Sequence, residues 1–124
     1  TFVRVKGNTT GSHLKGDKAA PYGALNEFKV ETVDCRPLFA WAGFAKLDCE
    51  GAEARLLATV TPECRCEFMG EIGTKENAAA IFKHFRGAGM WAQKNGWRQV
   101  EDVNDMPAHH SEGHVFIGEA PPFP

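Results

Sequence analysis

Three carboxylates lie close together in one short stretch of the sequence. Asp48, Glu50 and Glu53 fall within the run Lys-Leu-Asp-Cys-Glu-Gly-Ala-Glu, which occupies positions 46–53. A carboxylate can accept a hydrogen bond from a hydroxyl or an amine, and it can take up a proton as a general base. Gly51 permits a sharp bend or a close approach of the backbone to a ligand. We interpret the run as the rim of a site with Asp48 as candidate base; the other interpretation is a helix start whose acids stabilise the helix dipole.

Apolar patterns indicate the elements that position this cluster. Residues 44–47 predict a buried strand directly before it, and the four-residue spacing of Ala52, Leu56 and Val60 predicts a helix directly after it. Further predicted elements are strands at 2–5, 28–33, 67–72, 97–103 and 115–117, and a helix that Thr74 caps and Gly87 ends.

The alternation of strands and helices from residue 44 onward predicts a single α/β domain over residues 1–124, with a mostly parallel sheet and flanking helices. In such sheets ligands bind beyond the carboxyl ends of the strands. Glu71 lies at the end of the strand predicted at 67–72. We therefore expect Glu71 to face the same cleft as Asp48 and Glu50.

The run at positions 46–53 also resembles a known signature, the Lys-[Ile/Leu]-Asp-x-Glu-Gly-x-Glu of the FkbM-type S-adenosylmethionine-dependent methyltransferases. Weaker similarities follow the order of that family: residues 8–14 resemble its Gly-Ser loop, and residues 69–72 resemble its next strand. The resemblance covers most of residues 2–119 and corresponds to the carboxyl-terminal half of the family only. It implies a truncated, Rossmann-like methyltransferase fold.

The same resemblance implies a function, which is transfer of a methyl group from S-adenosylmethionine to a hydroxyl of a small molecule or sugar. The implied catalytic residues are Asp48, Glu50 and Glu71, and the implied substrate-binding residues are Ser12, His13 and Glu53. The family's cofactor-binding glycine loop lies upstream of the matched part, and the spacing of Gly7, Gly11 and Gly16 is not that of a dinucleotide loop. We therefore expect the cofactor to bind only where the other half of the fold is supplied.

The alternative function is a non-catalytic α/β module that self-associates or binds a protein partner. Without the upstream half, one sheet edge would be uncovered, and exposed edges and apolar patches mark partner surfaces. We therefore expect a homo-oligomer, in which a second copy covers this edge. The aromatic residues that could stack on a base or sugar are expected in the core instead; they are Phe39, Trp41, Phe44, Trp91 and Trp97.

Composition and charge exclude other classes of function. The 14 Lys and Arg residues are outnumbered by 16 Asp and Glu residues, so binding of nucleic acid through bulk charge is not expected. The sequence has no apolar run near the roughly 20 residues that cross a bilayer, so no membrane contact is expected. It also shows no secretory leader, so we expect a cytoplasmic protein.

The cysteines and histidines allow a metal site, but the pattern does not favour one. Cys64 and Cys66 with His109, His110 and His114 offer zinc ligands, yet their spacing matches no common finger. We expect no metal, free thiols and solvated histidines. The other interpretation places His109 and His110 at the border of a polar pocket.

Overall fold

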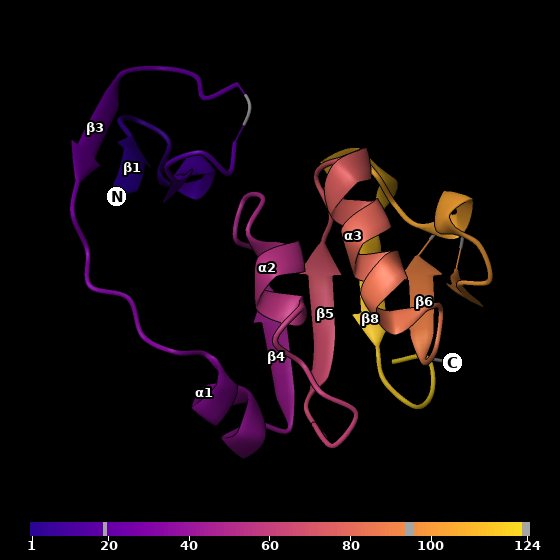
Figure 1. The fold of residues 1–124 in the computed structure, drawn as a ribbon. Helices are drawn as coiled ribbons and strands as arrows, with labels where there is room; N and C mark the ends of the chain where they lie inside the picture. The colour runs from indigo at the N-terminus through magenta and orange to yellow at the C-terminus, as the bar shows by residue number, and fades with distance from the viewer. Residues whose placement is uncertain (19, 94–95, 123–124) are drawn as a thin grey trace.

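The computed structural model describes residues 1–18, 20–93 and 96–122, and within them the strands form two sheets. The smaller, antiparallel sheet has the order β2-β1-β3 and consists of β1 (Phe2–Val5), β2 (His13–Leu14) and β3 (Leu25–Phe28). The larger sheet has the order β4-β5-β8-β6-β7 and consists of β4 (Phe44–Leu47), β5 (Glu67–Glu71), β6 (Met90–Gln93), β7 (Trp97–Gln99) and β8 (His114–Ile117). Figure 1 shows the smaller sheet beside the β4 edge of the larger one.

The prediction of a mostly parallel, Rossmann-like sheet is wrong. Among the described strands only β4 and β5 are neighbours that pair in parallel, with Ala45 opposite Phe68, and β8 pairs antiparallel with both β5 and β6. A parallel pair needs a crossover of a dozen or more residues, which the segment between Leu47 and Glu67 supplies. β7 begins only four residues after β6 ends, and so short a connection permits only the antiparallel pairing that is observed.

The described part of the chain also forms three α-helices: α1 (Arg36–Trp41), α2 (Glu53–Leu57) and α3 (Lys75–Phe85). The predicted cap of α3 is confirmed, because the Thr74 side chain accepts a hydrogen bond from the backbone of Asn77 at 3.1 Å. Arg86 ends this helix in the left-handed conformation. In Figure 1, α2 and α3 cover one face of the five-stranded sheet. The helix predicted over residues 52–60 is shorter than expected.

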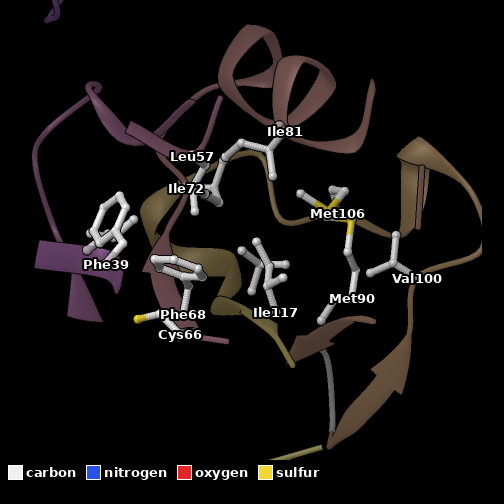
Figure 2. Close-up of a cluster of buried hydrophobic side chains, with 14 residues drawn as sticks. Phe39, Leu57, Cys66, Phe68, Ile72, Ile81, Met90, Val100, Met106 and Ile117 are labelled. Carbon is white, nitrogen blue, oxygen red and sulfur yellow. The ribbon is translucent and has the colours of Figure 1, made fainter. Parts of the chain in front are cut away.

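The hydrophobic core lies between these helices and the sheet. Figure 2 shows its side chains converging from the helices and strands. Phe39 of α1 packs edge-on against Phe68 of β5, with ring centroids 4.9 Å apart. Two aromatic residues expected in this core are instead exposed, since Trp41 is 87% and Phe44 is 51% accessible to solvent. The short helix α1 buries only Phe39, which leaves its other side open.

The segment between the two sheets differs from its prediction. A strand was expected at residues 28–33, but β3 ends at Phe28 and residues 29–34 have no regular structure. Alternation of apolar and polar residues indicates a strand only where a neighbouring strand pairs with it. Figure 1 shows this stretch leading from β3 down to α1. Val33, which lies in the stretch, is 81% exposed.

No helix in the described part of the chain combines the length and the apolar character that crossing a membrane requires.

Candidate functional site

The turn that joins β4 to α2 is held by one buried carboxylate. Glu50 and Gly51 both adopt positive φ angles, 54° and 117°, so the backbone reverses sharply after β4. The Glu53 carboxylate, 1% exposed, accepts hydrogen bonds from the backbone of Cys49 at 2.6 Å and of Gly51 at 3.0 Å. It accepts a third from the Asn77 side chain at 2.7 Å. The contacts of Glu53 therefore fix the turn, and its predicted role in substrate binding stays a prediction.

A cavity of about 430 Å³ opens beyond the carboxyl ends of β4 and β5. Because the two strands are parallel, these ends meet at the same edge of the sheet. Asp48 and Glu50 reach the cavity from the turn after β4, and Glu71 reaches it from the end of β5. The structure thus brings together the three residues that were predicted as catalytic.

The loop after β2 forms another wall of this cavity. The Lys18 ammonium lies 2.7 Å from a carboxylate oxygen of Glu50, and the Arg55 guanidinium lies 2.6 Å from the Asp17 carboxylate. A Cβ atom on Gly51 would overlap the backbone carbonyl oxygen of Asp17, so only glycine permits this close approach. These contacts dock the loop on the turn after β4.

The ion pairs leave two carboxylates available for a ligand. Glu50 is neutralised by Lys18, which also stands over the Tyr22 ring at 5.1 Å from its centroid. Asp48 has a longer contact of 3.4 Å with Lys46, and about half of each side chain is exposed, so this pair is weak. The Glu71 side chain has no hydrogen bond or ion pair to the residues that the structure describes. Asp48 and Glu71 are therefore the groups that can bind a ligand in this cavity.

Ser12 and His13 lie apart from Glu71, in a neighbouring cavity of about 330 Å³. Asp48 lines both cavities, and it is the link between the two sets of predicted residues. The Ser12 hydroxyl accepts a hydrogen bond from the backbone of Val5 at 3.3 Å, and His13 Nδ1 donates to the backbone carbonyl of Gly11 at 2.9 Å.

Four residues of the larger cavity escaped the sequence prediction or were placed differently; they are Asp17, Lys18, Tyr22 and His110. The first three belong to a polar loop whose length was its only signal. His110 was expected to be solvated, with the border of a polar pocket as the other interpretation. It is exposed and lines the cavity, and its ring stacks on His109 with centroids 3.9 Å apart.

The thiols of the described residues are free, and two of them are buried enough to alter their chemistry. Burial raises the pKa of Cys49, and the nearby Glu53 carboxylate raises it further. Burial also raises the pKa of Cys66. No group of three or more His, Cys, Asp or Glu side chains arranged to hold a metal ion is found in the ranges that the structure describes.

The glycines of this chain do not fit a nucleotide cofactor. A dinucleotide loop joins a strand to the start of a helix, but Gly7, Gly11 and Gly16 lie around the short strands β1 and β2 of the small sheet. Gly51 lines the larger cavity, yet the backbone of Asp17 already occupies the space beside it. The residues described here thus form no Gly-x-Gly-x-x-Gly loop between a strand and a helix.

Comparisons of the chain with protein-family models, with curated proteins and with solved structures find no match. The geometry of the two cavities is therefore the basis on which a function is proposed.

Proposed function

We propose that this chain forms the acceptor side of a methyl-transfer site, the reaction suggested by the resemblance of residues 46–53. One observation supports the proposal above the others. A single cavity gathers Asp48, Glu50 and Glu71 from the carboxyl ends of two adjacent parallel strands. The cofactor is then held by residues outside those described here, because the described residues form no dinucleotide-type glycine loop.

The acceptor in this proposal is a hydroxyl group. When its oxygen bonds to the methyl carbon, the carbon–sulfur bond of the sulfonium donor breaks, and the hydroxyl proton passes to a carboxylate within hydrogen-bond reach. Asp48, which is half-exposed and only weakly paired, is the candidate for this step. Glu71 lies across the cavity and accepts a hydrogen bond from a second hydroxyl, which orients the acceptor.

The charge of the cavity narrows the class of acceptor. Asp48 and Glu71 remain without strong partners, whereas the cation Lys18 is engaged by Glu50. A phosphate or carboxylate on the ligand would be repelled by these two carboxylates. The proposal therefore favours a neutral, polyhydroxylated acceptor such as a sugar.

Ligand-observed NMR tests this preference with methyl α-glucoside and glucose 6-phosphate as probes. We expect saturation transfer to the glucoside and none to the phosphate. Asp48→Asn and Glu71→Gln should each weaken the glucoside signal. Asp34→Asn, which alters an exposed carboxylate paired with Arg36 outside the cavity, should not. A glucoside signal that survives both cavity substitutions, or no signal at all, would contradict the proposal.

Calorimetry with S-adenosylmethionine tests the second claim of the proposal, which is that the cofactor is held by residues outside those described here. The present chain should give no binding heat, because its glycines are arranged for the small sheet and for the docked loop. Micromolar binding by this chain alone would show that the cofactor site has been assigned to the wrong residues.

A second candidate function is that of a non-catalytic module that associates with a second copy of the same chain. Exposed apolar side chains occur in and around α1 and the edge strand β4; they include Val33 before α1, Trp41 at its end and Phe44 at the start of β4. An edge strand presents unpaired backbone groups to a partner. A two-fold antiparallel pairing of β4 centred on Leu47 would set Lys46 of one copy opposite Asp48 of the other, so the charges are complementary.

A further inference from the structure

The smaller cavity has the size and lining of a small-molecule site. It lies between the three-stranded sheet and α2, and its volume of about 330 Å³ falls at the lower end of the range of about 300–1,000 Å³ for such sites. Its apolar walls come from Phe2, Leu14, Ala52 and Leu56. This lining suits a ligand with a compact apolar body.

His13 presents an unused hydrogen-bond acceptor in this cavity. The residue is only 3% exposed, and its Nδ1 lies 2.9 Å from the backbone oxygen of Gly11. A carbonyl oxygen can only accept, so Nδ1 must carry the hydrogen of this bond. In the neutral imidazole the other nitrogen, Nε2, then carries a bare lone pair.

The Nε2 lone pair of His13 is without a partner among the described residues and is accessible to a ligand. No hydrogen bond from the described residues reaches Nε2. At the same time, no side-chain nitrogen or oxygen of the described residues is both fully buried and without a partner. Nε2 is therefore open to space that a ligand can enter, and His13 is among the residues that line this cavity.

The other polar groups of the cavity are neutral or already engaged. The Ser12 hydroxyl accepts from the Val5 backbone, which leaves its own hydrogen free to donate. The Arg55 guanidinium is held by Asp17. The Cys49 thiol stays protonated, since burial raises its pKa. An anionic ligand would find no free cation among the described residues that line this cavity and would be repelled by the weakly paired Asp48 carboxylate.

We propose that this cavity binds a small neutral molecule with an apolar body and one hydroxyl, which donates its hydrogen bond to His13 Nε2. Such a ligand satisfies the unpartnered acceptor and covers the apolar walls at once. The inference concerns a different cavity from the methyl-transfer proposal and does not rest on it.

Phenol and toluene are the matched probes, because they share a ring and differ in one hydroxyl. An apolar cavity without an acceptor would prefer toluene, since phenol must shed water from its hydroxyl. With Nε2 available, we expect phenol to bind about fivefold or more tighter than toluene. Titrations followed by amide NMR give both affinities, and imidazole nitrogen NMR should show the Nε2 signal of His13 moving with phenol alone.

His13→Asn removes the ε nitrogen, while its side-chain amide can still donate to the Gly11 carbonyl. This variant should reverse the order and bind toluene more tightly than phenol. His13→Gln, which restores an acceptor near the ε position, should recover part of the phenol preference. His114→Asn is the matched control on β8, outside the cavity, and should leave both affinities unchanged.

Three results would overturn the inference. The first is that the wild-type chain binds toluene as tightly as phenol, or binds neither at their solubility limits. The second is an unmoved His13 Nε2 signal on saturation with phenol, a measurement that needs no variant. The third is a reversed preference in Asp48→Asn instead of His13→Asn, which would assign the acceptor to the carboxylate.

Discussion

The side-chain amide of Asn77 donates a hydrogen bond to the Glu53 carboxylate at 2.7 Å, and this contact ties α3 to the turn that carries Asp48. The Asn77 side-chain oxygen accepts from the backbone of Ala54 at 3.0 Å, so one residue engages both partners. The geometry of the larger cavity thus depends on a residue that lies outside it.

Substitutions at this contact should destabilise the fold. Glu53→Gln turns one acceptor into a donor that faces backbone N–H groups, and we expect a loss of about 2 kcal/mol or more in the free energy of unfolding. Asn77→Asp places a second carboxylate against Glu53 and should cost a comparable amount. Urea denaturation measures both. Glu76→Gln on the exposed side of α3 is the control, and an equal loss there would contradict the assignment.

Alanine substitutions at Gly51 and Gly16 distinguish the stability cost of backbone strain from the stability cost of steric overlap. Gly51 and Gly16 both have positive φ angles, 117° and 96°. A Cβ atom on Gly51 would overlap the backbone of Asp17, whereas a Cβ atom on Gly16 would meet nothing within 4 Å among the described residues. Gly16→Ala should cost about 1–2 kcal/mol for its backbone conformation. Gly51→Ala should cost at least about 1 kcal/mol more because of the overlap.

The Gly51→Ala substitution should also release the loop that carries Asp17 and Lys18. Limited proteolysis with trypsin provides the measurement, because Lys15 and Lys18 lie in this loop. Cleavage there should be faster in Gly51→Ala than in Gly16→Ala. Equal cleavage rates would show that the contact with Asp17 does not hold the loop in place.

The exposed side chains Trp41 and Phe44 provide a test of self-association. Because both are more than half exposed, Trp41→Ser and Phe44→Ser should change the unfolding free energy of the monomer little. If a second copy covers them, sedimentation velocity should show a dimer for the wild type that dissociates in either variant. A monomeric wild type at about 100 μM, a concentration well above typical specific affinities, would contradict the association.

Alkaline pH should weaken the fold through Cys66. Burial raises the pKa of its thiol in the folded state above that in the unfolded chain. The stabilisation from the neutral thiol is therefore complete below the unfolded-state pKa of about 8.5 and is lost as the pH rises through the folded-state pKa. The free energy of unfolding should fall as the pH rises above about 8.5.

Cys66→Ala provides the control for this pH dependence. It should lower stability at neutral pH, because it removes a buried sulfur from the core, and it should reduce the alkaline slope. An unchanged slope in this variant would assign the pH dependence to other groups, including Cys49.

Local features of the sequence were predicted well, and their physical basis is short in range. The strand before the acidic run, the helix cap at Thr74 and the gathering of Asp48, Glu50 and Glu71 depend on neighbours within one strand or on one parallel strand pair. Side-chain periodicity and capping chemistry carry that information directly.

The direction of β8 could not be predicted in the same way. An apolar run such as residues 115–117 indicates a buried strand, but it does not specify whether the strand lies parallel or antiparallel to its neighbours. That choice depends on the route of residues 100–113, which contain only short 3₁₀ turns at Val103–Asp105 and His110–Glu112. The same limit applies to Lys18, because its partner Glu50 lies 32 residues away.

The position of β8 has a consequence for how the domain assembles during synthesis. This strand is the last of the described strands in sequence, yet it lies in the middle of the larger sheet, between β5 and β6. Chains are made from the amino terminus at about 5–20 residues per second, so β5 and β6 are complete before the strand that joins them exists. A ribosome that stalls before residue 114 would present two unpaired strand edges, and the nascent chain would depend on chaperones until the last strand is inserted.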